Sequence, residues 1–220
     1  MSFDDELLAR VIWDEETAVA ELTKIFESDR TTVLKTHCAI DDYPVRARLE
    51  NLGFEAKREF TERGIRRQRF TCDRYDFIRT LAEAKMAEHL DMDVWTFGYD
   101  SAKRRAGLCN YTARTITISR YLVDIHTFDE SMQVVLHEIA HAIAGKKAGH
   151  TKAWLAIAKS IGYRAEKFTG KEIALETAKW VGVCPAGHEH FRYRKPTRQL
   201  ACGLCGQGFS RRNLISWTQR

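Results

Sequence analysis

One short segment constrains the fold of this 220-residue chain more than any other: the run 134–145, with the sequence VVLHEIAHAIAG. Its apolar residues recur at helical spacing, which predicts a helix buried along one face. Residues four apart lie on the same side of a helix, so the imidazoles of His137 and His141 share one side. Two histidines and Glu138 on a buried helix are costly unless a ligand satisfies them.

Residues that commonly start and stop helices mark the ends of this helix. Thr127 and Glu130 have the spacing of a capping box, in which each side chain accepts a hydrogen bond from the other residue's amide. Gly145 is a natural C-terminal stop. We therefore predict a helix over residues 129–144.

The pattern H-E-x-x-H is typical of a zinc site in which both histidines bind the ion. Glu138 projects about 100° away from His137 around the helix, toward a water molecule whose pKa zinc lowers to about 7. We therefore expect His137 and His141 to bind zinc and Glu138 to act as general base. A catalytic zinc usually has three protein ligands. His150, after a loop that two glycines bound, is the predicted third, and Glu166 is the alternative.

The rest of the chain predicts an α+β fold. Residues 54–72 have the pattern of two strands joined near Gly64, and TITIS at 115–119 alternates most clearly of all. Pro44 and Gly53 suit the start and the end of a short helix. Helices are predicted within 1–30, 44–53, 75–90, 129–144, 151–161 and 166–180, and strands within 54–72, 94–99, 105–109 and 115–119.

Two groups of ligand-type residues lie near the C-terminal end. Cys184-Pro-Ala-Gly-His188 is followed, after thirteen residues, by Cys202-Gly-Leu-Cys205. Two ligand pairs separated by a hairpin-sized insert predict a closed, tetrahedral zinc ribbon. We expect His188 as the fourth ligand because it follows a glycine, as in a metal-binding knuckle, and His190 is the alternative. The chain would then bind two zinc ions, one catalytic and one structural.

Positive charge is concentrated in this same region. Residues 179–220 carry eight Lys or Arg against one Glu, whereas the other 178 residues carry 27 Lys or Arg against 29 Asp or Glu. Basic side chains neutralise phosphates, and the aromatic residues interleaved with them can stack on exposed bases. The sequence therefore predicts a nucleic-acid surface on the ribbon. The expected contacts are Arg192, Arg194, Lys195, Arg198, Arg211 and Arg212.

The remaining cysteines and the N-terminal segment bear on the compartment. Cys38, Cys72 and Cys109 have no partner at ligand spacing, so we expect them to be reduced, structural thiols. No apolar stretch reaches the 18 residues that a membrane-spanning helix needs, and the first ten residues lack the apolar region of a secretory signal. We expect a cytoplasmic protein that does not contact membranes, associated with the nucleoid if it is bacterial.

Taken together, these motifs resemble the SprT-like (Spartan-type) family of zinc metallopeptidases, whose members include a DNA-dependent protease that clears DNA–protein crosslinks. The resemblance covers about residues 75–220 and includes the zinc ribbon. The matching runs are WTFGYD (95–100), RRAGLC (104–109), TITIS (115–119), LHEIAHAIAG (136–145) and AGHTKAW (148–154).

The resemblance implies a zincin-like metallopeptidase domain, with an active-site helix beside a small antiparallel sheet, followed by a C-terminal zinc ribbon. It implies peptide-bond hydrolysis with Glu138 as general base and His150, just before Trp154, as third ligand. It also implies that a sheet edge binds substrate as an added strand, for which residues 115–119 are the candidate. Asn110, Tyr111 and Arg114, just before this strand, are candidate substrate contacts.

These expectations define three parts: an α+β appendage over 1–74 with no assigned role, an SprT-like metallopeptidase domain over 75–178, and a basic zinc ribbon over 179–220. The expected function is zinc-dependent endopeptidase activity on DNA-associated proteins. One alternative is a non-proteolytic DNA-binding or scaffold protein that retains its zinc sites. Another is a small-substrate hydrolase such as an amidase, which would need a deep closed pocket.

Overall fold

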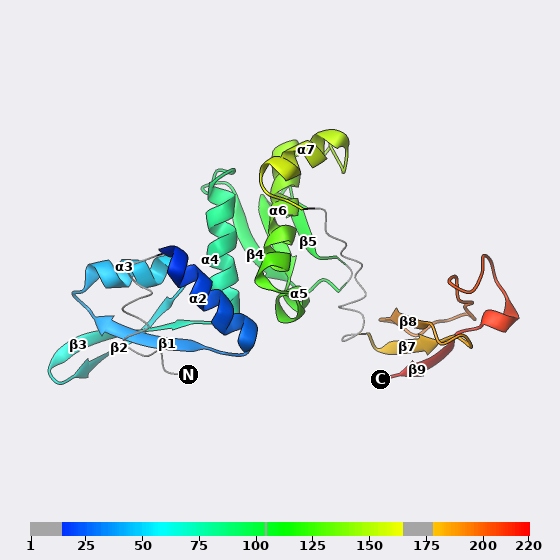
Figure 1. Cartoon of the computed structure of the whole chain (residues 1–220), viewed down its shortest axis with the longest axis horizontal. Coiled ribbons are helices and arrows are strands. Elements are labelled where there is room, and N and C mark those ends of the chain that lie inside the picture. The colour runs from blue at the N-terminus through cyan, green and yellow to red at the C-terminus, as the bar shows by residue number, and fades with distance from the viewer. Residues whose placement is uncertain (1–14, 104, 165–177) are drawn as a thin grey trace. The chain divides into compact units, whose positions relative to one another are not determined.

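A computed structural model describes residues 15–103, 105–164 and 178–220, and its contacts divide the chain into two compact units (Figure 1). The first unit comprises residues 1–100 and 107–166, and the second comprises 101–106 and 167–220. The helices of the first unit are α2 (Glu15–Ser28), α3 (Tyr43–Asn51), α4 (Arg74–Ala87), α5 (Arg120–Ile125), α6 (Phe128–Ala144) and α7 (Lys152–Ser160). Its strands are β1 (Leu34–Ala39), β2 (Glu55–Glu62), β3 (Ile65–Cys72), β4 (Thr96–Asp100), β5 (Gly107–Asn110) and β6 (Thr115–Ser119). The predicted α+β class is confirmed.

The N-terminal part of the first unit is a three-stranded antiparallel sheet in the order β1-β3-β2. The predicted hairpin within 54–72 is present as β2 and β3, and its turn holds Arg63 and Gly64 at positive φ. Helices α2 and α3 lie on one side of this sheet (Figure 1). Phe26 of α2, Leu49 of α3 and Phe70 of β3 are fully buried together in the core.

The second sheet has the order β4-β6-β5 and lies beside α6. Strand β6 pairs in parallel with β4 and antiparallel with β5, so this sheet is mixed and not wholly antiparallel. The prediction that residues 115–119 form an edge strand is wrong, because β6 is the central strand. Alternating β-branched residues indicate a strand, but its position in the sheet depends on pairing with distant segments. The burial of Ile116 and Ile118 at 0% exposure fits that central position.

Helix α6 ends at the predicted Ala144 and begins at Phe128, one residue before the predicted start. The capping box of Thr127 and Glu130 is formed in both directions, and the C-cap is Gly145, which has a φ of 82°. Buried residues from α2 through α6 belong to one continuous hydrophobic cluster. The predicted division of the chain at residue 74 remains a prediction, and the two segments that it separates share this core.

Arg74, the first residue of α4, ties several elements together from inside this core. The side chain is 1% exposed, and its guanidinium donates to the carbonyl oxygens of Phe26 (3.0 Å), Val123 (2.8 Å) and His126 (2.6 Å). It also lies 4.3 Å from the ring centroid of Phe128, the first residue of α6. One cation therefore satisfies carbonyl groups near the C-terminal ends of α2 and α5. The second of these ends lies directly before the start of α6.

Replacing Arg74 with methionine is expected to lower the free energy of unfolding by about 3–5 kcal/mol, because three buried carbonyl groups lose a charged donor. Urea denaturation of the full chain measures this loss. Lys85→Met on the same helix is the control. Its exposed pair with Glu88 is worth at most about 1 kcal/mol. Equal losses in both variants would contradict a role for Arg74 in joining these elements.

The second unit contains a three-stranded antiparallel sheet, β8-β7-β9, formed by β7 (Trp180–Val183), β8 (Glu189–Arg192) and β9 (Ser216–Gln219), with the short 3-10 helix η1 (Arg211–Asn213). The helix predicted over 166–180 falls mostly outside the described residues, and its last residue, Trp180, begins β7 instead. Gly182 leaves room for its neighbours, since a Cβ there would collide with Ile215 and Trp217.

Within the described ranges, none of the helices is both long enough and apolar enough to cross a membrane.

Candidate metal centres

The three predicted histidine ligands converge on one point. Helix α6 presents His137 and His141 one turn apart, and the loop after Gly145 brings His150 to the start of α7, where Thr151 caps the helix. The Nε2 atoms of His137 and His141 are 3.2 Å apart, and the Nε2 atom of His150 lies 3.0 Å from each of them. The runner-up ligand, Glu166, lies outside the described residues.

This arrangement fits a metal ion. Two nitrogen ligands bound at about 2.0–2.1 Å to one tetrahedral ion lie roughly 3.3 Å apart, close to the observed separations. Three imidazoles whose Nε2 atoms face one another cannot all satisfy one another by hydrogen bonding, because a neutral ring has one donor and one acceptor nitrogen. A cation at their centre accounts for all three orientations, so the set is compatible with zinc.

Protonation of these rings is also suited to metal binding. Burial, reinforced by the neighbouring rings of His141 and His150, lowers the pKa of His137 to about 4. Burial, with His150 adding to it, also lowers the pKa of His141. His137 is therefore neutral at pH 7, which is the state that a ligating imidazole requires.

Aromatic side chains enclose the three imidazoles. Trp154 of α7 is 5% exposed and stacks on His141, with ring centroids 5.1 Å apart and an angle of 29°. Tyr163 packs edge-on against His137 at 5.4 Å. The hydroxyl of Tyr111 donates to the carbonyl oxygen of His141 at 3.0 Å. The ring contacts of Trp154 and Tyr163 restrict the imidazoles, whereas Tyr111 holds the backbone of α6. Apart from Trp154, these residues follow from no motif in the sequence.

The structure gives each of the three candidate substrate contacts a structural partner. Tyr111 binds the backbone of α6, as described above. The side chain of Asn110 accepts hydrogen bonds from the amides of Thr112 and Ala113, which closes the turn between β5 and β6. Arg114, at a φ of 54°, lies over the ring of Trp95 at 5.3 Å.

Glu138 lies beneath strand β5 and is 7% exposed. The close approach depends on Gly107, the first residue of β5. A Cβ at Gly107 would lie 2.7 Å from Oε1 of Glu138 and 2.9 Å from a methyl group of Val134. The need for glycine at position 107 was not predicted, because the residues near Gly107 in the sequence do not indicate that it faces α6.

If Glu138 is the general base that the sequence predicts, replacing Gly107 with alanine is expected to lower kcat/KM by about 10–100-fold, since displacing such a group by about 1 Å has effects of that size. Zinc content should stay unchanged. Gly98→Ala is the matched control in the same sheet, because its Cβ would make an ordinary contact with Thr117 at 3.8 Å. Equal activity in the two variants would show that the Gly107–Glu138 contact does not position the carboxylate.

The four predicted ribbon ligands form a second cluster in the second unit. Sγ of Cys184 lies 3.6 Å from Nδ1 of His188 and 3.6 Å from Sγ of Cys205, and Nδ1 of His188 lies 3.6 Å from Sγ of Cys202. Ligands of one tetrahedral zinc with Zn–S bonds of about 2.3 Å are separated by roughly 3.6–3.8 Å. His188 belongs to this cluster, whereas His190 lies in strand β8.

Local turns bring the ribbon ligands together. The amide of Gly187, at a φ of 80°, donates to the carbonyl oxygen of Cys184, and the amide of Cys205 donates to that of Cys202. Burial opposes ionisation of the Cys184 thiol, but amide groups of His188 and Ala186 donate to its sulfur and lower its pKa. This site is compatible with zinc held by three thiolates and one imidazole.

The other cysteines differ from the ribbon cysteines, as predicted. Cys38, Cys72 and Cys109 are buried and belong to neither of the ligand clusters found among the described residues. Burial raises the pKa of all three thiols, with that of Cys109 at about 11. They remain protonated at neutral pH and pack as small apolar side chains.

The six basic residues predicted to contact nucleic acid are all exposed on the second unit. Lys195 lies 5.6 Å from the ring centroid of Trp180, and Arg192 lies 6.0 Å from that of Trp217. Phe209, just before η1, is 63% exposed. The exposed set is Arg192, Arg194, Lys195, Arg198, Arg211 and Arg212.

Two imidazoles from α6, which also carries the buried Glu138, and a third from the loop that follows form a candidate H-E-x-x-H metal site, the arrangement of a metallopeptidase-like hydrolase domain. Comparison with known families agrees: residues 80–176 match the SprT-like family, which confirms the resemblance seen in the motifs. The match ends before the zinc ribbon. No curated protein and no solved structure gives a match to the chain.

Proposed function

We propose that the protein is a zinc-dependent endopeptidase that acts on DNA-associated proteins, with a zincin-like active domain and a zinc ribbon that binds DNA. The observation that carries the proposal is the convergence of three Nε2 atoms at separations of 3.0–3.2 Å. Two of them come from α6, which also carries Glu138, and the third comes from the loop that follows. The SprT-like match over residues 80–176 supports it.

The chain's own residues supply the remaining parts of the reaction. A bound zinc ion would polarise the attacking water and the scissile carbonyl group. Glu138 then accepts the proton of the attacking water and delivers it to the leaving amine. Low solvent access strengthens the electrostatic interactions of this carboxylate, and Gly107 lets it lie against β5.

Strand β5 is an edge strand of its sheet and lies beside α6. We propose it for the substrate-binding role that the family resemblance implied for residues 115–119. An extended substrate segment that pairs with an exposed strand edge gains backbone hydrogen bonds without regard to its sequence. An endopeptidase using this edge would accept many unfolded proteins, and its selectivity would come from where the ribbon places it.

Cleavage of a DNA-bound protein and of casein, each with and without single-stranded DNA, tests this function. The zinc-loaded full chain is expected to cleave the DNA-bound protein faster than casein, and 1,10-phenanthroline should stop both reactions by removing zinc. Absence of cleavage of either substrate by protein with a full zinc complement would contradict the peptidase proposal.

A second candidate function is a DNA-binding or scaffold protein that retains its zinc sites. The six exposed cations on the second unit favour it, because they could bind DNA without any catalytic activity of the protein. A scaffold would keep its cellular function with Glu138→Gln and lose it with Cys202→Ser. An endopeptidase would lose its function with either variant.

A further inference from the structure

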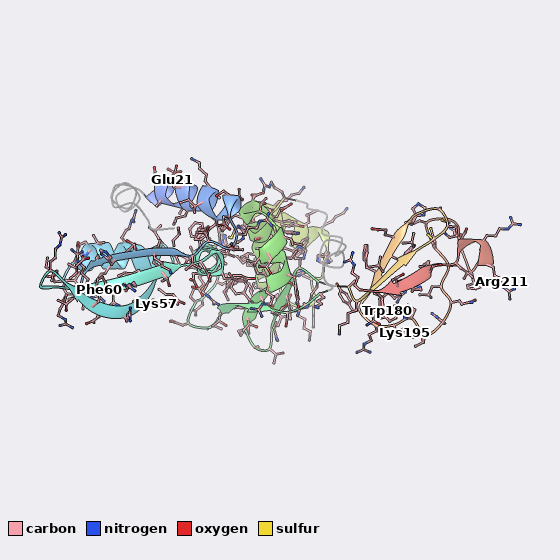
Figure 2. All side chains as sticks on the ribbon, turned by 90° about the horizontal axis from the view of Figure 1, so that it is seen from below. Glu21, Lys57, Phe60, Trp180, Lys195 and Arg211 are labelled. Carbon is pink, nitrogen blue, oxygen red and sulfur yellow. The ribbon has the colours of Figure 1, made fainter. Side chains whose placement is uncertain are left out.

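Among the described residues, the N-terminal sheet has one face that α2 and α3 do not cover. Along β3, the buried side chains of Gln68, Phe70 and Cys72 alternate with less buried ones, so every second residue points away from α2 and α3. The same alternation holds in β1. Figure 2 views this sheet from below, with Lys57 and Phe60 labelled on β2. The outward residues of β1 and β3 are Lys35, His37, Ala39, Arg67, Arg69 and Thr71.

An ordered group of flat side chains lies on this open face. Phe60 of β2 pairs in register with Arg67 of β3. The guanidinium carbon of Arg69 lies 5.0 Å from the ring centroid of Phe60, and the ring of His37 meets Phe60 edge-on at 5.4 Å. His37 and Arg69 are register partners across β1 and β3. Three strands thus contribute to one cluster of flat rings and a planar cation.

The charge of these strands is opposite to that of the segment that contains them. Strands β1 to β3 with their hairpin turn carry seven Lys or Arg against three Glu, whereas residues 1–178 together carry a net −2. The three glutamates pair with Lys57, Arg66 and Arg67. Across the described ranges the structure shows no ion pair for the other four cations, Lys35, Arg58, Arg63 and Arg69.

We propose that this open face binds single-stranded nucleic acid. Lys35 and Arg69, two outward cations for which the described residues provide no ion pair, can neutralise phosphates, and the Phe60–Arg69 stack offers a planar surface on which an unstacked base can lie. Bases of a duplex are already stacked on one another, so they cannot use this surface. An acidic polypeptide would satisfy the cations but has no use for a preformed aromatic–guanidinium stack.

This surface is separate from the ribbon surface because it belongs to the first unit. It assigns a role to the N-terminal segment, which precedes the residues that match the SprT-like family. Nucleic-acid binding by the sheet does not depend on peptidase activity. Either proposal can therefore be contradicted while the other holds.

The test measures binding of fluorescein-labelled oligo(dT) and oligo(U), 15 nucleotides long, by fluorescence anisotropy. The full chain carries Arg192→Ser, Arg194→Ser and Lys195→Ser throughout, so that ribbon binding does not mask the sheet. Phe60→Leu is expected to weaken binding about five-fold or more, the low end for loss of one stacked base. Phe60→Trp, which keeps a ring, should bind like the parent.

Salt dependence provides the second measurement. Arg69→Ala is expected to reduce the slope of log K against log salt concentration by about 0.7, the value for one phosphate contact on a single strand. The matched control is Lys24→Ala on α2, an exposed cation paired with Glu21 away from the sheet face, which should change neither affinity nor slope. Thermal unfolding shows that each variant is folded.

Three outcomes would overturn the proposal. The first is equal binding by the Phe60→Leu, Arg69→Ala and Lys24→Ala variants. The second is competition by a duplex of the same length that is as effective as competition by the single strand, which would show that unstacked bases do not contribute to binding. The third is displacement of the oligonucleotide by polyglutamate as effectively as by unlabelled oligo(dT), which would identify an acidic polypeptide as the partner. Equal affinity for DNA and RNA strands would support a shared single-strand chemistry.

Discussion

Replacing Glu138 with glutamine is expected to lower kcat for peptide hydrolysis by about 10²–10⁴-fold while leaving the metal content unchanged. Glutamine has nearly the same shape as glutamate, so it keeps the packing beneath Gly107, but it cannot accept the proton of the attacking water. General base catalysis contributes rate factors of this size. Because none of the three converging Nε2 atoms belongs to Glu138, the histidine set is preserved.

The matched control is Glu130→Gln on the same helix. Glu130 closes the capping box with Thr127, a position where glutamine also serves, so this variant changes neither the imidazoles nor the catalytic carboxylate. Peptidase assays and elemental analysis are made on both proteins in parallel. If Glu138→Gln cleaves substrate as fast as Glu130→Gln, Glu138 is not the general base, and the scaffold function becomes the better account.

Local rules were enough to predict the helix that carries the candidate metal site. The ends of α6 depend on Thr127, Glu130 and Gly145, all within the helix or adjacent to it, and the shared side of His137 and His141 follows from helical geometry alone. The ribbon ligands were predictable for the same reason, since each pair lies within five residues. That the two pairs lie together could be inferred because a closed zinc site needs the ligands of both pairs.

Features that depend on pairing between distant segments were not predictable in this way. The central position of β6 is set by β4 and β5 on either side, and its own sequence says nothing about them. Gly107 is required because Glu138, 31 positions later, packs against it. The carbonyl groups that Arg74 satisfies are 48 to 52 residues away in sequence. A single sequence shows residue types but not these partners.

Strand β1 illustrates an intermediate case. This strand was not among the predicted ones, although its sequence, LKTHCA, alternates between the core and the open face. Pairing of β1 with β3 places its outward Lys35 and His37 beside the outward Arg67 and Arg69 of the sheet.

The second large effect concerns metal stoichiometry. The parent chain is expected to bind two zinc ions, and His137→Ala/His141→Ala is expected to bind one, because a single remaining imidazole cannot hold the ion. Cys202→Ser/Cys205→Ser should also lose one ion, but with a different consequence. Apparent binding free energies for structural zinc in small domains are about 10–16 kcal/mol, and this energy is also folding energy. We therefore expect the second unit to unfold without its zinc, while the first unit stays folded.

Elemental mass analysis gives the zinc count, and limited proteolysis reports folding of each unit. The matched controls are His89→Ala and Cys38→Ser, which remove the same chemical groups outside both clusters and should leave two ions bound. A parent chain with one zinc that His137→Ala/His141→Ala does not change would mean that only the ribbon binds metal. The H-E-x-x-H helix would then be a structural element, because Glu138 would have no polarised water to deprotonate, and DNA binding would be the function left to test.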